Sequence, residues 1–245
     1  MRLYGLIGMP LAQSFSKKYF TEKFEKENIA DARYELFPLE KIDCLNELLN
    51  AQPHLQGLNV TIPYKEQVLP YLQDFDAEAK KIGAFNCIKI KNGQLKGFNT
   101  DAPAFKRSLL PQLQPHHKKA LILGTGGAAK AVLFVLQDLG IEYMFVSRSK
   151  ENGLLYSELT PGILAEYPLI INTTPLGSFP KVDTAPEIPY RFLNSGNYLY
   201  DLVYNPEKTL FLQKGEAQGA TIKNGYEMLA GQAELSWEIW SDNDK

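Results

Sequence analysis

The sequence predicts an α/β protein with mostly parallel sheets. Two observations carry this prediction. Short apolar runs alternate with amphipathic stretches along the first hundred residues. A strand, a glycine turn, a helix and a second strand then follow one another in residues 119–150. Alternation of strands with helices is typical of parallel sheets that carry helices on their faces.

The composition indicates a globular protein with no nucleic acid, membrane or metal as a partner. The 245 residues suffice for one large domain or two of ordinary size, and 44% of them are hydrophobic and 22% charged. The formal net charge of -2 gives no electrostatic reason to bind nucleic acid or an acidic membrane. Cys44 and Cys87 lack the spacing of metal ligands, so they indicate free thiols in a reducing cytoplasm.

The apolar start of the chain resembles a signal peptide but is broken by Gly5, Gly8 and Pro10. This pattern predicts a first strand and a turn instead. No run of residues is long and apolar enough to span a bilayer.

The first hundred residues contain five apolar runs bounded by turn residues. These runs predict strands at residues 3–7, 33–37, 58–62, 87–90 and 95–98. Helical patterns lie between and after them, at residues 18–28, 41–49, 63–72, 77–82 and 103–110. Pro63 opens the third of these helices, because proline is favoured in a first helical turn. Asn92-Gly93 predicts a tight hairpin between the last two strands.

Residues 119–150 read KALILGTGGAAKAVLFVLQDLGIEYMFVSRSK and predict a dinucleotide-binding unit. A buried strand at 120–123 runs into Gly124-Thr125-Gly126-Gly127-Ala128-Ala129, which fits G-x-G-x-x-A. A helix and a strand at 142–146 follow, which is the context that makes this motif specific. Gly124 makes the tight turn, Gly126 admits a pyrophosphate, and Ala129 lets helix and strand pack closely. The amides and the dipole at the start of the helix then hold the phosphates.

The end of the second strand of this unit indicates NADP rather than NAD. An Asp or Glu usually binds the free ribose hydroxyls of NAD at this position, but this chain has Ser147-Arg148-Ser149-Lys150. A guanidinium pairs with a 2′-phosphate, whereas an acid repels it. The alternative interpretation is a turn for helix packing followed by a solvated basic loop.

After residue 150 the alternation of predicted strands and helices continues, with short connections. Strands are predicted at residues 169–172, 198–203 and 220–223. Pro206 starts a predicted helix that ends near residue 217. A terminal helix presents Leu229, Ala233, Trp237 and Trp240 on one face.

Several polar residues ahead of the glycine turn have both a structural and a functional interpretation. Ser14 and Ser16 precede a helix and are either helix caps or ligands of an anion. Asp101 is either the N-cap of the helix that contains Pro103 or a functional carboxylate. Asn86 either ends a strand or binds a ligand.

Asn59, Thr61 and Lys65 form a second group of this kind. Asn59 and Thr61 alternate with apolar residues, so they share one face of a predicted strand, which by itself indicates only exposure to solvent. Lys65 lies in the first turn of the predicted helix, where a cation opposes the helix dipole. Chance placement on the surface is the alternative explanation.

The order of these motifs resembles the shikimate dehydrogenase family over essentially the whole chain. The resemblance rests on Ser14-x-Ser16, N-V-T-I-P-Y-K at 59–65, G-A-F-N at 83–86, G-F-N-T-D at 97–101, G-T-G-G-A at 124–128, Ser147-Arg148-Ser149, N-T-T-P-L-G at 172–177, D-L-V-Y-N-P at 201–206, Thr209 and residues 225–232. Departures include Lys17, where the family usually has proline, and a short segment at 151–168.

The resemblance implies two domains and a role for each candidate residue. Residues 1–103, joined by a C-terminal helix at 226–245, are implied to be an α/β substrate-binding domain, and residues 104–225 a Rossmann-like NADP-binding domain. The implied catalytic residues are Lys65 and Asp101. The implied substrate ligands are Ser14, Ser16, Asn59, Thr61, Asn86, Tyr204 and Gln232. The implied cofactor contacts are Gly124, Thr125, Gly126, Gly127, Ala128, Ser147, Arg148, Ser149, Lys150, Thr173, Leu202 and Gly225.

The implied activity is the NADPH-dependent, reversible reduction of 3-dehydroshikimate to shikimate in a cytoplasmic monomer or homodimer. One alternative is a quinate or shikimate dehydrogenase that uses NAD or NADP. Another is a non-enzymatic NADP-binding sensor, which would keep the glycine turn and discard the polar set. The presence of both Lys65 and Asp101 argues against a sensor.

Overall fold

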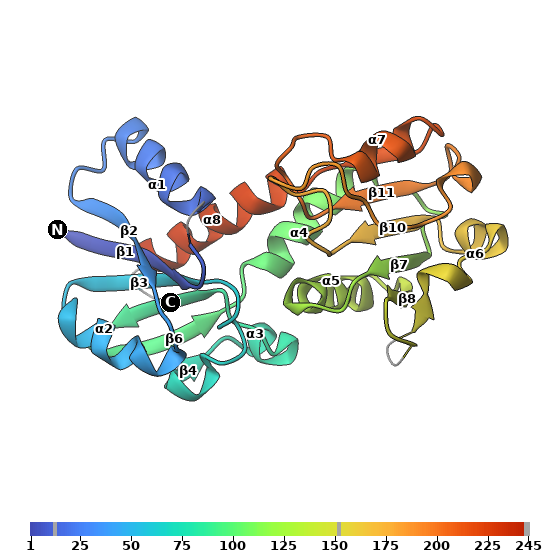
Figure 1. Cartoon of the computed structure of the whole chain (residues 1–245). Helices are drawn as coiled ribbons and strands as arrows, with labels where there is room; N and C mark the ends of the chain where they lie inside the picture. Colours follow the sequence, from blue (N-terminus) through green and yellow to red (C-terminus); the bar gives the residue numbers. More distant parts are fainter. Residues whose placement is uncertain (12–13, 151–152, 243–245) are drawn as a thin grey trace. The chain divides into compact units, whose positions relative to one another are not determined.

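The computed structural model describes residues 1–11, 14–150 and 153–242, and the chain divides into two compact units (Figure 1). Unit 1 comprises Met1–Asp101 and Ala230–Lys245, and unit 2 comprises Ala102–Leu229. The sequence placed the corresponding boundaries after residues 103 and 225. The predicted α/β class with mostly parallel sheets is confirmed in both units.

Unit 1 contains a mixed sheet of six strands in the order β2-β1-β3-β5-β6-β4. Their bounds are β1 (Arg2–Gly8), β2 (Ala32–Pro38), β3 (Leu55–Val60), β4 (Asp74–Phe75), β5 (Cys87–Lys91) and β6 (Gln94–Phe98). β1 runs parallel to β2 and β3, whereas β5 is antiparallel to β3 and β6. The β5–β6 hairpin turns at Asn92 and Gly93, both with positive φ, as their sequence predicts.

Helices cover both faces of this sheet because side chains alternate along its strands. The helices are α1 (Phe15–Lys26), α2 (Leu45–Ala51), α3 (Ala77–Ile82) and most of α8 (Tyr226–Ser241), with short 3₁₀ turns η1 (Ile42–Cys44) and η2 (Leu69–Tyr71). Leu3 and Ile7 of β1 face a core shared with α2. Tyr4, between them in sequence, belongs to the aromatic core formed with α1 and α8. These two helices lie on the other side of the sheet from α2 (Figure 1).

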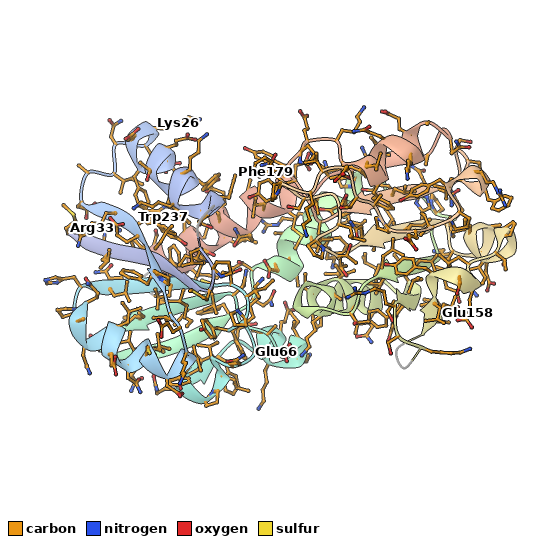
Figure 2. The ribbon with its side chains drawn as sticks, in the orientation of Figure 1. Lys26, Arg33, Glu66, Glu158, Phe179 and Trp237 are labelled. Carbon is orange, nitrogen blue, oxygen red and sulfur yellow. The ribbon has the colours of Figure 1, made fainter. Side chains whose placement is uncertain are left out.

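The helix α8 docks onto bare backbone in unit 1. A Cβ atom on Gly57 of β3 would come within 2.3 Å of the Trp240 indole, so only glycine admits that ring. The indole nitrogen of Trp240 donates to the carbonyl of Ile88 at 2.9 Å. Lys89, which is buried, donates to the carbonyls of Ile239 and Asp242 at the end of the helix. Trp237 packs against the ring of Tyr4 in the same cluster (Figure 2).

Unit 2 contains an all-parallel sheet of six strands in the order β12-β11-β10-β7-β8-β9. Its strands are β7 (Lys119–Leu123), β8 (Glu142–Ser147), β9 (Leu154–Leu155), β10 (Leu169–Asn172), β11 (Tyr198–Asp201) and β12 (Thr221–Lys223). Its helices are α4 (Asp101–Leu109), α5 (Gly127–Asp138), α6 (Pro161–Glu166) and α7 (Leu210–Glu216), with 3₁₀ turns η3 (Leu110–Gln112), η5 (Tyr156–Glu158) and η6 (Tyr190–Phe192). This is the doubly wound order of dinucleotide-binding sheets, with the reversal of strand order between β7 and β10.

Two predicted helices differ from the structure. Residues 62–68 form successive turns that lead into η2, not a helix opened by Pro63. The carbonyl of Lys65 accepts from the amide of Phe85 at 2.7 Å, a bond to a distant segment in place of one within a helix. The second helix starts at Leu210 rather than at Pro206, because Thr209 supplies the N-cap. None of the helices in the described part of the chain combines the length and the apolar composition needed to cross a bilayer.

Candidate active site

The catalytic candidates of unit 1 form an ion pair. The Nζ atom of Lys65 lies 2.6 Å from Oδ2 of Asp101, and the two side chains are only 21% and 12% exposed. Lys65 is held by the turn after β3, where Phe85 binds its carbonyl and the hydroxyl of Tyr64 donates to Leu39. Asp101 is the first residue of α4, just after β6. Two segments that are far apart in the sequence thus deliver one ammonium and one carboxylate to the same place.

Asn59 and Asn86 lie beside this pair in a buried network. Asn59 ends β3 with Val60, and its Nδ2 donates to the carbonyl of Asn86 at 3.2 Å. The side chain of Asn86 donates to the hydroxyl of Thr100 and accepts from its amide, at 2.9 and 2.6 Å. Thr100 precedes Asp101, and Asn86 follows Phe85, so the network and the ion pair share two backbone segments. Sequence periodicity placed Asn59 on a solvent face, whereas it is buried.

Ser14 stands at the N-cap position of α1 but does not cap it. Its side chain makes no capping hydrogen bond. Its Oγ atom is buried and has no hydrogen-bond partner among the described residues. Because buried hydroxyls are normally bonded, this atom has an unused capacity for a ligand. Ser16 is buried two residues further on, in the first turn of the helix.

The other three predicted substrate ligands, Thr61, Gln232 and Tyr204, come from three different segments of the chain. Thr61 follows β3 and donates its amide to Ile7 at 2.9 Å, so it extends the strand pairing by one residue. Gln232 is buried on α8, in unit 1. Tyr204 belongs to unit 2, where it follows β11, and burial raises the pKa of its hydroxyl.

The glycine turn of unit 2 lies at the reversal of strand order, where doubly wound sheets bind ligands. Gly124 has a φ of +99°, and a Cβ atom there would come within 2.8 Å of Thr174. A Cβ on Gly126 would meet nothing within 4 Å, which leaves room for a ligand against the backbone. Thr125, Gly126 and Gly127 are exposed, and Ala129 is buried at the contact of α5 with the sheet. The residues present therefore fit a dinucleotide pyrophosphate.

Loops from β10 and β11 complete this edge of the sheet. The hydroxyl of Thr173 donates to the carbonyl of Leu123 at 2.8 Å, which ties the β10 loop to the end of β7. Gly225 packs closely against Leu202: a Cβ atom on Gly225 would come within 2.1 Å of the Leu202 carbonyl oxygen. The predicted contacts Thr173, Leu202 and Gly225 thus line the same edge.

A buried carboxylate that sequence reasoning missed holds these loops. Oδ1 of Asp201 accepts from Asn172 Nδ2 at 2.9 Å and from the amide of Val203 at 3.0 Å. Oδ2 accepts from the Thr209 hydroxyl at 2.5 Å. Burial is the largest effect on Asp201 and raises its pKa to about 6, although the three hydrogen bonds oppose that shift. The available signal was an acidic residue at the end of an apolar strand, in D-L-V-Y-N-P.

The loop after β8 separates the two predicted cations. The Ser147 hydroxyl turns inward and binds the amide of Ser149 at 3.1 Å, which shapes the loop. Lys150 already pairs with Glu158 at 2.8 Å. Arg148 is exposed and makes no hydrogen bond or ion pair with the residues that the structure describes. Arg148 is therefore the better candidate to pair with a phosphate.

Two further observations concern what lies outside this site. Across the described ranges, no group of three or more His, Cys, Asp or Glu side chains is arranged to hold a metal ion. A cavity of about 520 Å³ in unit 1 is lined by His54, Lys91 and Trp240, among others, and includes none of the predicted site residues.

Comparison with known proteins assigns the chain to a family. Residues 6–88 match the family model "Shikimate dehydrogenase substrate binding domain". A shikimate dehydrogenase (NADP(+)) of Clostridium beijerinckii is 39% identical over 99% of this chain and 93% of its own length. A crystal structure of Thermus thermophilus shikimate 5-dehydrogenase with NADP(H) and shikimate has a TM-score of 0.86 at 31% identity, and covers 98% of this chain and 94% of that one. The Listeria monocytogenes enzyme, in complex with shikimate and NAD, gives 0.85 at 27% identity, with coverages of 98% and 92%. The chain therefore belongs to the shikimate dehydrogenase family.

Proposed function

We propose that this protein is a shikimate dehydrogenase that reduces 3-dehydroshikimate reversibly to shikimate with NADPH. The observation that carries the proposal is the largely buried ion pair of Lys65 and Asp101. It lies in the unit whose residues 6–88 match the substrate-binding family model, and the other unit has the doubly wound sheet. The curated relatives bear the name shikimate dehydrogenase (NADP(+)).

The serines at the start of α1 are proposed to hold the substrate carboxylate. The unpartnered Oγ of Ser14 supports this role, and so do the free amides and the dipole of the first helical turn. Thr61, Asn86 and Gln232 are proposed to bind the ring hydroxyls, together with Asn59 and Tyr204. A substrate that lacks a matching hydroxyl leaves a buried polar group unsatisfied, which gives discrimination.

Lys65 is proposed to move the proton. In reduction, its ammonium gives a proton to the ring oxygen as negative charge develops there, and in oxidation the neutral amine takes that proton back. Asp101 holds Nζ at a fixed distance and stabilises its charged form. Bound NADPH supplies the hydride for this reaction.

Residues of unit 2 are proposed to bind NADP. Gly124, Thr125, Gly126, Gly127 and Ala128 cradle the pyrophosphate at the N-terminus of α5. The 2′-phosphate pairs with Arg148 in the loop that Ser147 and Ser149 shape, while Lys150 adds positive charge. Thr173, Leu202 and Gly225 are proposed to contact the nicotinamide half. The exposed guanidinium is what favours NADP over NAD.

An assay with two substrates and two cofactors tests the proposal. Reduction of NADP and NAD is measured with shikimate and with quinate, and the highest kcat/KM is expected for shikimate with NADP. A preference for quinate would replace the substrate assignment, and a preference for NAD would replace that of the cofactor. NADP binding without turnover of either acid would identify a sensor.

We also expect the enzyme to work in the cytoplasm as a monomer or homodimer. Cys44 and Cys87 are free, and burial raises the pKa of Cys87 to about 12, so both suit a reducing compartment. Size-exclusion chromatography with light scattering distinguishes the two oligomeric states.

A further inference from the structure

Asn59 is bonded to two side chains that the proposed reaction does not use. The hydroxyl of Tyr34, on β2, lies 2.8 Å from Oδ1 of Asn59. The hydroxyl of Ser236, on α8, lies 2.8 Å from Nδ2. All three residues are nearly inaccessible to solvent, with exposures of 3% for Tyr34, 3% for Asn59 and 0% for Ser236. Strands β2 and β3 and helix α8 therefore meet at one carboxamide.

Two backbone carbonyls fix the direction of each bond to Asn59. The carbonyl of Asn86 can only accept, so the atom of Asn59 that faces it must be the nitrogen. The hydroxyl of Ser236 donates to the carbonyl of Gln232 at 2.8 Å, so its oxygen accepts from the same nitrogen. The oxygen of Asn59 must then face Tyr34, which donates to it.

This arrangement decides what Asn59 offers to a ligand. Both hydrogens on Nδ2 are used, by Asn86 and Ser236. Among the described residues Oδ1 accepts from Tyr34 alone, and it has a second lone pair. The carboxamide therefore presents an acceptor. A ligand hydroxyl satisfies it as a donor, whereas a ligand carbonyl does not.

Packing keeps Tyr34 in its place. Its ring stacks on Phe20 with centroids 4.5 Å apart and planes at 15°. Burial raises the pKa of its hydroxyl well above the ordinary value, with a smaller opposing effect from Ser16, so the proton stays on the oxygen at any working pH. Tyr34 thus remains a donor and contacts two predicted substrate ligands from a strand that carries neither of them.

We propose that Tyr34 and Ser236 are positioning residues that hold the Asn59 carboxamide in one orientation, with its oxygen free to accept from a substrate hydroxyl. This inference rests on the proposed function. Without Tyr34 the oxygen is left unsatisfied, and without Ser236 one hydrogen of the nitrogen loses its partner. In either case the carboxamide keeps its bond to Asn86 but is held by one bond fewer, so its oxygen is placed less firmly for the substrate hydroxyl.

The test compares two buried tyrosines of the same aromatic core. Tyr34→Phe removes the hydroxyl that binds Asn59. Tyr4→Phe removes one that binds Gln56, at 3.3 Å, and Arg2, neither of which is a predicted site residue. We expect Tyr34→Phe to raise the KM for shikimate roughly tenfold, with the NADP dissociation constant unchanged. Tyr4→Phe should keep the parental KM even where its Tm falls by a similar amount. An equal KM for the parent and Tyr34→Phe would overturn the proposal.

A double-mutant cycle gives a readout that loss of stability alone does not produce. In an Asn59→Ala background, Tyr34→Phe should raise the KM no further, because its effect acts through the missing carboxamide. A full additive increase would refute positioning. Ser236→Ala is expected to raise the KM for shikimate in the parent but not in the Asn59→Ala background, as Tyr34→Phe does. If Tyr34→Phe does not fold, the KM of Ser236→Ala tests the proposal in its place. A parent that does not turn over shikimate would instead refute the proposed function, so the two failures are distinguishable.

Discussion

The ammonium of Lys65 and the carboxylate of Asp101 lie 2.6 Å apart and largely out of solvent. The pair Lys18–Glu22 on α1 is a useful contrast, because its side chains are 79% and 65% exposed and its charges are 3.8 Å apart. Exposed ion pairs of that kind contribute little to the stability of the fold, and salt screens them. The pair of Lys65 and Asp101 is placed by two anchored segments, so its geometry persists before any substrate arrives.

Lys65→Ala should lower kcat by about 10² to 10⁴, which is the usual contribution of a positioned proton donor. The affinity for NADP should be nearly unchanged, because the predicted cofactor residues belong to unit 2. Steady-state kinetics with a separate fluorescence titration of NADPH measures both quantities. Lys65→Arg should not restore turnover, since a guanidinium barely gives up its proton. Turnover within a few-fold of the parent would remove Lys65 from the mechanism.

Arg148→Ala should weaken NADP far more than NAD, by roughly ten- to hundredfold, because a charge-assisted hydrogen bond is lost. Lys150→Ala is the matched control. Lys150 is paired with Glu158, so its removal should change the NADP/NAD ratio less. Isothermal titration with both cofactors gives the two ratios. If Lys150→Ala changes the NADP/NAD affinity ratio more than Arg148→Ala does, the 2′-phosphate pairs with Lys150 and the assignment to Arg148 is wrong.

Ser14→Ala should raise the KM for shikimate without lowering the Tm, since the side chain makes no capping bond. Ser16→Ala should raise the same constant. Asp76→Ala is the opposite case, because the Asp76 carboxylate caps α3 by accepting from Glu78 and Ala79. That variant should lose about 1 kcal/mol of stability and keep the parental KM. Parental shikimate titrations for both serine variants would show that these hydroxyls bind no substrate.

Asp201 should make the stability of unit 2 depend on pH below neutrality. Its pKa is raised from 3.8 to about 6 in the folded protein, mainly by burial. The folded state therefore holds the proton more tightly than the unfolded chain, and the stability from this group is lost as the pH rises from about 4 to 6. The free energy of unfolding of Asp201→Asn, relative to the parent, should increase over that window and then level off. Urea titrations at several pH values measure the difference, and a constant difference would contradict the prediction.

Local signals predicted the parts of this fold that depend on local chemistry. Gly124 requires its positive φ, and Asn92-Gly93 suits a tight hairpin, so both turns are found where the sequence placed them. The helix predicted at residues 63–72 is wrong because Pro63 is equally compatible with a turn. The hydrogen bond from Phe85 that favours the turn comes from a distant segment of the chain.

The candidate site shows the same division. The motifs identified Asn59, but periodicity assigned it to a solvent face, because its partners Tyr34 and Ser236 lie elsewhere in the chain. Asp201 was missed as a support of the cofactor loops for the same reason. Its meaning depends on Asn172 and Thr209, which only the folded sheet brings to it.

The docking of Trp240 on Gly57 also sets the order in which the two units can be completed during synthesis. Unit 2 is continuous in sequence, so all of its residues have been made before α8 is finished. Unit 1 lacks one wall of its aromatic core until Trp240 leaves the ribosome, long after β1 and α1 have emerged. Domains ordinarily fold in the order in which they are made. In this chain the synthesis of unit 1 starts first, but its core is completed last. Until Trp240 has been made, the backbone of Gly57 and the ring of Phe20 lack the indole that covers them.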